Sequence, residues 1–412
     1  MTAPRRLVLA ALGLLLGTTA ALAQTTPPPR PGAPGTEEPP PARIQLGPVG
    51  VRPAVIFREV GYDSNVLNRN TDEQGDFTAT VGGRVDLGAR VARLLTSASG
   101  FYEYLYFKDF ESERGSNRGV EGRVDVLLGR LRPHVLGGLR TSHDRPSPEI
   151  DTRALRTQVT VGTGLAYAAG SHTTLGVTYR GDAGDFEDDE EFRGVNLADE
   201  LNLRSHALTF TTGFELTPLT TVSAYAEERR DRFTRSPDRD ANSHRYGGNV
   251  TFNPLALISG QATVGIAAFR PLSDLEPDFT GLTAAVALAY AYQDQSRLAV
   301  SFDRDVRHSF DEETPYYVGT GGRATFTQRL FRNIDGQVMI GFDRIAYEAR
   351  LDEPQVVDNQ TDRVRLAGGG LGIRLREAAR LAINYDHTVR RSEVPTRDYA
   401  RGRLYATLNY GF

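Results

Sequence analysis

Residues 401–412 read RGRLYATLNYGF and end the chain on a strict alternation of side-chain types. The apolar positions are Leu404, Ala406, Leu408, Tyr410 and Phe412. The positions between them carry mostly polar or charged side chains. Successive side chains of a β-strand point to opposite faces, so this period of two predicts a strand with one apolar and one hydrophilic face.

The same alternation recurs along the chain from Val49 onward. We expect about 18 such segments (16 to 18), each roughly 10 to 14 residues long, which suits tilted membrane strands. Tight connections, as at 129–130 and 170–171, alternate with long polar ones, as at 182–199. Hydrocarbon cannot satisfy backbone polar groups, so a membrane-spanning sheet must close on itself. The sequence therefore predicts an all-β fold, a transmembrane antiparallel up-and-down β-barrel.

Composition excludes several other classes of protein. The 412 residues contain no cysteine, which removes disulfides and thiolate chemistry. Lysine and arginine total 48 against 52 acidic residues, and this near balance does not favour a nucleic-acid partner. A mean hydropathy of −0.38 excludes a bundle of membrane helices.

The chain divides into three predicted parts. Residues 1–23 combine two arginines, a short apolar run and an Ala-Leu-Ala cleavage site, as in a secretory signal peptide. Residues 24–48 are rich in proline and are expected to form an extended periplasmic spacer. Residues 49–412 form the predicted barrel. An even number of strands would place both ends in the periplasm and the long loops outside the cell.

The segment at the first long loop carries a short motif, Tyr62-Asp63-Ser64-Asn65. In layout and in this motif the chain resembles the porin-2-like family of outer-membrane β-barrels, which is often associated with exopolysaccharide export. The resemblance implies an outer-membrane location in a Gram-negative cell and a role in moving a secreted polysaccharide, with polysaccharide and periplasmic export components as partners.

The end of the chain carries a second signal. Leu408, Tyr410 and Phe412 share one face, and this pattern resembles the closing-strand signal that hands barrel proteins to the barrel assembly machinery. The apolar face of the predicted strands would point outward, so we expect it to contact outer-membrane lipid and lipopolysaccharide.

Alternation also predicts which charged side chains line the lumen. The candidates are Arg84, Asp86, Arg123, Asp125, Arg297, Asp303, Asp335, Asp343, Arg363, Arg365, Arg380, Asp386, Arg401 and Arg403. These groups would either pair across strands and stabilise the wall or create a field that selects solutes.

No catalytic site, cofactor or metal site is expected. The seven histidines are scattered and form no recognised motif, and the acidic run at 182–191 lacks the spacing of a calcium loop. We therefore expect a channel for a hydrophilic polymer or solute and not an enzyme. The alternatives are a general small-solute porin and a closed structural or surface-interaction barrel. Loops of about 8 to 18 residues look short for filling so wide a lumen, which favours transport.

Overall fold

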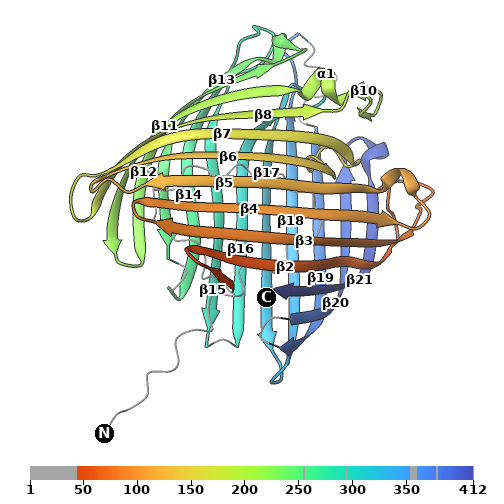
Figure 1. The fold of residues 1–412 in the computed structure, drawn as a ribbon. Coiled ribbons are helices and arrows are strands. Elements are labelled where there is room, and N and C mark those ends of the chain that lie inside the picture. The colour runs from red at the N-terminus through yellow and green to blue at the C-terminus, as the bar shows by residue number, and fades with distance from the viewer. Residues whose placement is uncertain (1–43, 254–255, 294, 353–359, 377–378, 412) are drawn as a thin grey trace.

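The computed structural model describes residues 44–253, 256–293, 295–352, 360–376 and 379–411 as a closed antiparallel barrel of 18 long strands (Figure 1). This confirms the predicted fold class. The predicted signal peptide, the predicted spacer up to residue 43, and Phe412 lie outside the described residues. None of the helices in those ranges is long and apolar enough to cross a membrane.

The long strands follow one another around the wall in chain order. They are β2 (Val49–Asp63), β3 (Asp76–Val91), β4 (Leu94–Phe107), β5 (Gly115–Val126), β6 (Leu131–Asp144), β7 (Ala154–Ala168), β8 (Thr173–Phe186), β11 (Leu203–Thr217), β12 (Thr220–Phe233), β13 (Ala241–Phe252), β14 (Ile258–Pro271), β15 (Phe279–Tyr292), β16 (Ser296–His308), β17 (Tyr316–Arg329), β18 (Ile334–Glu348), β19 (Thr361–Arg376), β20 (Ala379–Ser392) and β21 (Tyr399–Gly411). The short elements are β1 (Ile44–Leu46), η1 (Glu111–Glu113), β9 (Glu191–Phe192), β10 (Val195–Asn196), α1 (Leu197–Leu201), η2 (Pro237–Arg239) and η3 (Pro395–Arg397).

Strand β2 closes the barrel by pairing with both β3 and β21. The register with β21 runs from Ala54 opposite Gly411 to Asp63 opposite Arg403, with a shift between Phe57 and Val60. Strand β1, in the stretch predicted as spacer, pairs with the first residues of β2. In Figure 1 the strands β2–β8 run across the view, whereas β18–β20 behind them run steeply, as the strong tilt of barrel strands requires.

The two faces of each strand meet different surroundings. On β20 the outward side chains Leu381, Ile383 and Tyr385 are 38%, 62% and 53% exposed, whereas the intervening Ala382 and Asp386 are each 1% exposed. The exposed apolar face is the one that lipid would cover, and the other faces the lumen.

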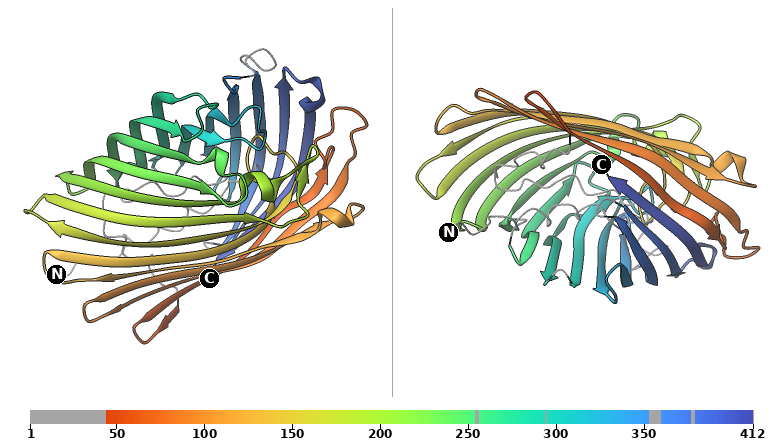
Figure 2. Two further views of the ribbon diagram at one scale, coloured as in Figure 1. Left: turned by 90° about the horizontal axis from the view of Figure 1, so that it is seen from above. Right: turned by 60° about the horizontal axis from the view of Figure 1, so that its bottom comes forward.

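Long and short connections lie at opposite ends of the barrel, as the alternation predicted (Figure 2). We call these the long-loop end and the short-turn end. The long connections include residues 64–75, 145–153, 187–202 and 309–315. They are the segments that reach over the lumen.

One pair of neighbouring strands separates near the long-loop end. The register of β15 with β16 ends at Ala284 opposite Arg304, although β15 extends back to Phe279 and β16 on to His308. Strands β16 and β17 remain paired up to His308 opposite Tyr316. The tip of this hairpin is therefore not paired with β15, and it packs elsewhere at the long-loop end.

Candidate functional site

Most of the predicted lumen-lining side chains lie on the face opposite the exposed apolar ones. The residues on this face are Arg84, Asp86, Arg123, Asp125, Arg297, Asp303, Asp335, Asp343, Arg380, Asp386, Arg401 and Arg403. Their part in passing a solute stays a prediction.

Many of these charges pair along one strand. Arg84 lies 2.7 Å from Asp86 and Arg123 lies 2.7 Å from Asp125, each two residues apart on the same face. The pattern returns in Arg180 with Asp182 on β8 and in Arg229 with Asp231 on β12. The spacing R-x-D is visible in the sequence. Other ion pairs join different strands: the buried Asp335 of β18 pairs with Arg380 of β20.

Arg363 and Arg365 were predicted to line the lumen, and this is wrong. On β19 they share the outward face with Leu371 and Ile373, which are 61% and 39% exposed, while the buried Val364 points inward. The register is continuous across Gly368–Gly370, so no bulge reverses the faces. Charge at the end of a strand can also face lipid headgroups, and the prediction failed because it treated every charge as lumenal.

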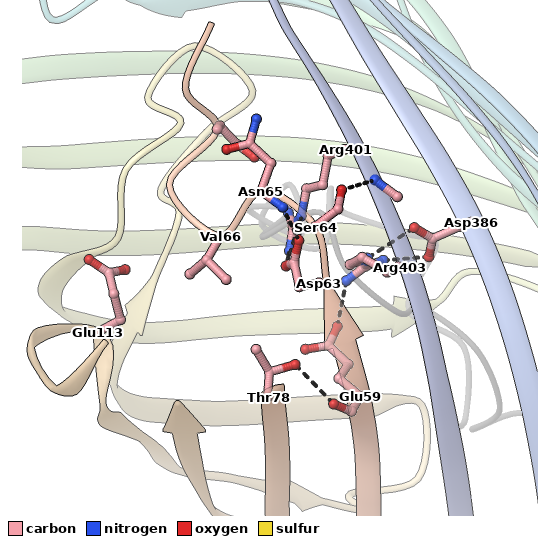
Figure 3. Close-up of polar contacts among 12 residues, drawn as sticks. Glu59, Asp63, Ser64, Asn65, Val66, Thr78, Glu113, Asp386, Arg401 and Arg403 are labelled. Carbon is pink, nitrogen blue, oxygen red and sulfur yellow. Dashed lines mark hydrogen bonds and ion pairs between the residues drawn. The ribbon is translucent and has the colours of Figure 1, made fainter. Parts of the chain in front are cut away.

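The motif at the first long loop forms a clasp between the first and last barrel strands (Figure 3). Nε of Arg401 donates a hydrogen bond that the two carboxylate oxygens of Asp63 share at 2.9 Å each, Nη2 of Arg401 donates to Oδ2 as well, and both side chains are buried. Ser64 exchanges two bonds of 2.9 Å with Gly402, one through its amide and one through its hydroxyl oxygen.

The neighbouring residues complete the clasp. Asn65 is fully buried and donates to the carbonyls of Arg69 at 2.8 Å and Ala400 at 3.0 Å. Tyr62 points outward and is 56% exposed. A Cβ at Gly61, next to the register shift, would lie 2.0 Å from the carbonyl oxygen of Leu404, so the close approach needs glycine. The motif therefore closes the barrel, a role that four letters of sequence did not reveal.

A second ion-pair cluster lies below the clasp on the lumen side. Arg403 donates to both oxygens of Asp386 at 2.9 and 2.6 Å and to Glu59 at 3.0 Å (Figure 3). Of the predicted assembly signal, Leu408 and Tyr410 lie opposite Phe57 and Val55 of β2. The terminal strand thus carries the clasp on its inner face and the predicted assembly signal on its outer face.

At the long-loop end, two loops from distant parts of the wall meet over the lumen. The hydroxyl of Ser309, between β16 and β17, donates to Oε1 of Glu149, between β6 and β7, at 2.5 Å. Strands β8 and β11–β15 separate these hairpins in one direction, and β18–β21 with β2–β5 separate them in the other. Both side chains are buried, at 0% and 1% exposure. The contact therefore spans the barrel.

Arginines brace this contact from other parts of the wall. Arg390 of β20 donates to the carbonyl of Pro148 at 3.1 Å and pairs with Asp151 at 3.2 Å. Arg239, the last residue of η2, pairs with Glu200 at 2.8 Å and donates to the carbonyl of Ser309. Each arginine thus ties a loop to a second hairpin.

Burial raises the pKa of Glu149 to about 7, although the hydrogen bond from Ser309 and the charges of Arg397, Arg239 and Arg390 oppose the shift. Each of these arginines also has another carboxylate partner: Arg390 and Arg397 pair with Asp362, and Arg239 pairs with Glu200. Glu149 is therefore a carboxyl that a proton stabilises at the centre of the loop contact.

An apolar cluster forms over the lumen from the same loops. It contains Ile150, Ala154, Phe186, Phe192, Leu197, Ala198 and Phe310, from three different connections or their adjoining strands. The rings of Phe192 and Phe310 meet edge to face, with centroids 4.8 Å apart. We expected these loops to be too short to fill the lumen, yet they meet over it. Large apolar residues within otherwise polar loops were the signal that sequence reasoning missed.

The separated tip of β16 and β17 packs inside the barrel wall. Val306 joins Phe269, Ala241 and Tyr316 in a buried cluster. The His308 ring lies 5.4 Å from that of Phe269, a residue of the inner face of β14. This hairpin tip is therefore part of the constriction at the long-loop end.

The lumen brings together Ser205, Asp231 and His308. Asp231 accepts from Ser205 at 2.5 Å and lies 3.2 Å from Nε2 of His308. The carboxylate stands between hydroxyl and imidazole, so His308 does not contact the serine as the base of a serine–histidine–aspartate triad does. Within the described ranges there is no group of three or more histidine, aspartate or glutamate residues that could hold a metal.

Comparisons with known proteins identify a family and several similar solved structures. The model of the family described as putative beta-barrel porin 2 matches residues 40–412. A similar solved structure is OpdK of Pseudomonas aeruginosa, with 9% identity, 88% of this chain and 99% of that chain covered, and a TM-score of 0.49. OccK3 (OpdO) of the same organism has 11% identity, covers 88% and 95%, and has a TM-score of 0.46. A search of curated proteins found no match.

Proposed function

Because the chain belongs to the putative beta-barrel porin 2 family, we propose that this outer-membrane barrel is a gated channel for anionic hydrophilic solutes. The long-loop end faces the outside of the cell in this proposal and the short-turn end faces the periplasm. The wall fits such a role, because its outer face is apolar and its inner face carries polar and charged groups throughout.

The basic rim of the short-turn end carries the proposal. We define this rim as Arg90, Arg93, Arg130, Arg132, Arg329 and Arg332. Among the described residues none of these side chains has a carboxylate within salt-bridge distance. Arg90, Arg132 and Arg329 lie on the lumen face of β3, β6 and β17. In the ladder Arg329 lies opposite Asp335, which pairs with Arg374 and Arg380. A pore entrance that carries more arginines than carboxylates attracts anions and repels cations.

The reversal potential of the full-length protein in a planar bilayer tests this proposal. Under a potassium chloride gradient we expect chloride to carry most of the current. The variant Arg90→Gln/Arg132→Gln/Arg329→Gln should lose much of this preference. The control Arg363→Gln/Arg365→Gln changes outward arginines and should keep it. A cation-selective wild-type channel, or an equal loss in the control, would contradict the proposal.

Gating rests on the contact between Glu149 and Ser309. The chain has no cysteine, so Glu149→Cys/Ser309→Cys introduces a single possible disulfide. We expect oxidation to hold the two loops together and to lower the conductance, and reduction to restore it. If a variant shown to be cross-linked has the same conductance when oxidised and when reduced, these loops are not the gate.

Export of an anionic polysaccharide is the second candidate. A basic rim on the periplasmic side would collect an acidic polymer at the entrance of an export route, with periplasmic export components delivering it. Polygalacturonate added on the short-turn side should block the channel, whereas neutral dextran of similar size should not. If both polymers, or neither, change the current, the polymer version fails while the solute channel stands.

A further inference from the structure

Four outward arginines form a patch near the long-loop end of the barrel. Arg344 of β18 lies directly opposite Arg363 of β19, and Arg363 lies directly opposite Arg391 of β20. Arg365, two residues further along β19, lies opposite Phe342. All four arginines are exposed. We call these four residues the outer arginine patch.

Three of the patch arginines lack a partner in the part of the chain that the structure describes. Arg391 pairs with Asp398 at 3.1 Å, but no hydrogen bond or ion pair of Arg344, Arg363 or Arg365 is present within those residues. Like charges directly opposite on neighbouring strands destabilise a sheet. The described residues supply no counter-charge to Arg344, Arg363 or Arg365, and a negative group from outside the barrel would stabilise the arrangement.

Three outward arginines elsewhere on the same end pair with carboxylates of the protein. Their pairs are Arg204 with Asp185 at 2.7 Å, Arg230 with Glu228 at 2.7 Å, and Arg270 with Asp278 at 3.3 Å. Arg118 of β5 is also outward and exposed without an ion pair among the described residues, but its cross-strand neighbours are Tyr102 and Thr141. The outer arginine patch differs because its cations lie opposite one another on neighbouring strands.

The patch lies at the edge of the apolar surface that lipid would cover. Directly below it on the same outward faces are Phe342, Ile340 and Leu371, which are 48%, 60% and 61% exposed. A group that binds the patch must therefore sit where hydrocarbon gives way to headgroups. Guanidinium groups on neighbouring strands, about 5 Å apart in the sheet, can hold one phosphate from two sides.

We propose that the outer arginine patch binds the phosphate-bearing headgroup of a lipid in the outer leaflet. The inference rests on the outer-membrane location and on the proposed outward orientation of the long loops. The lipid phosphate supplies the missing negative charge, and its acyl chains cover the apolar side chains below. The patch names the residues through which the expected contact with lipopolysaccharide is made.

The test measures lipid binding by the refolded full-length barrel in detergent. The probes are bisphosphorylated lipid A, the same lipid after removal of both phosphates, and inorganic phosphate. The variant is Arg344→Gln/Arg363→Gln/Arg365→Gln. The matched control is Arg204→Gln/Arg230→Gln/Arg270→Gln, which also removes three outward arginines. Native mass spectrometry reports the bound lipid.

We expect bisphosphorylated lipid A to bind the wild type and the control, and to bind the variant about 100-fold more weakly. Dephosphorylated lipid should bind weakly to all three proteins. Equal losses in variant and control would overturn the proposal, as would tight binding of dephosphorylated lipid. Retention of inorganic phosphate as well as lipid A would replace a lipid site by a free-anion site.

Two further measurements separate folding and transport from lipid binding. The variant with three lysines at the same positions keeps the charge but loses the fork-like donors, so it should bind lipid A with intermediate strength. If the glutamine variant does not fold, the lysine variant still decides the question. Conductance should not change in either variant, so loss of lipid binding with normal conductance leaves the proposed channel function intact.

Discussion

Glu149→Gln is the substitution that tests the loop contact across the lumen most directly. The pKa of Glu149 is raised from 4.5 to about 7 by burial. When the loops part and water reaches the side chain, its pKa should return towards 4.5. The closed arrangement therefore binds a proton that the open arrangement releases.

The sign and size of the effect follow from this difference. Below pH 4.5 both arrangements are protonated, and the closed one keeps its full stability. Between pH 4.5 and about 7 the closed arrangement loses about 1.4 kcal/mol per pH unit, and above pH 7 the loss is complete at about 3 kcal/mol. Such a loss shifts the balance between closed and open channels by about two orders of magnitude towards open.

Single-channel recording between pH 5 and pH 8 measures this shift as the fraction of time spent closed. We expect closed time to fall as the pH rises in the wild type. Glu149→Gln should stay largely closed at every pH, because the amide is neutral and can still accept the hydrogen bond from Ser309. The control Glu187→Gln removes an exposed loop carboxylate and should keep the wild-type profile. A wild-type profile in Glu149→Gln, or closed time that rises with pH, would refute the reasoning.

Three other predictions concern the wall. Asp63→Ala should destabilise the barrel by about 3–5 kcal/mol by leaving Arg401 buried and unpaired, and adding Arg401→Ala should recover part of the loss in urea unfolding; a larger loss in the double variant would contradict the clasp. Ile340→Arg should cost about 2–4 kcal/mol on folding into lipid vesicles, and an unaffected barrel would mean that this face does not meet lipid. Thr283→Cys/Asp305→Cys should cross-link only when the tip of β16 rejoins β15. Because thiolate formation alone speeds cross-linking at high pH, its rate is compared with that of Thr263→Cys/Ala285→Cys, a pair directly opposite in β14 and β15; the ratio of the two rates should be higher at pH 8 than at pH 5, and equal ratios would show that the tip does not move with the gate.

The barrel could be predicted from the sequence because apolar and polar side chains alternate along each membrane strand. This alternation is visible within a single strand. The alternation of Leu381, Ile383 and Tyr385 with polar side chains is visible without knowing any neighbour. The same rule misplaced Arg363 and Arg365, because a lipid-facing strand end beyond the hydrocarbon accepts charge. The lipid-facing positions of a strand are therefore assigned from the residues at its middle, and the alternation is then extended to its two ends.

The contact over the lumen could not be predicted in the same way. Glu149, Ser309 and Arg390 are far apart in sequence, and only closure of the barrel brings them together. Glu149 looks like an ordinary loop carboxylate, yet it is almost completely buried. The clasp was partly visible, since Asp63 and Asn65 lie in a recognisable motif, but its partner Arg401 lies on the last strand.

The hairpin tip of β16 and β17 can either pack inside the barrel or pair with β15, but not both at once. Packed inward, Val306 and His308 fill space inside the barrel, and the backbone edge of β15 from Phe279 to Thr283 has no β16 register. Swung outward, the same tip would extend the ladder with β15 and empty the lumen. The same movement would then open the lumen and complete the pairing of β15 with β16. Hydrogen bonds formed between β15 and β16 would offset the apolar packing lost at the long-loop end.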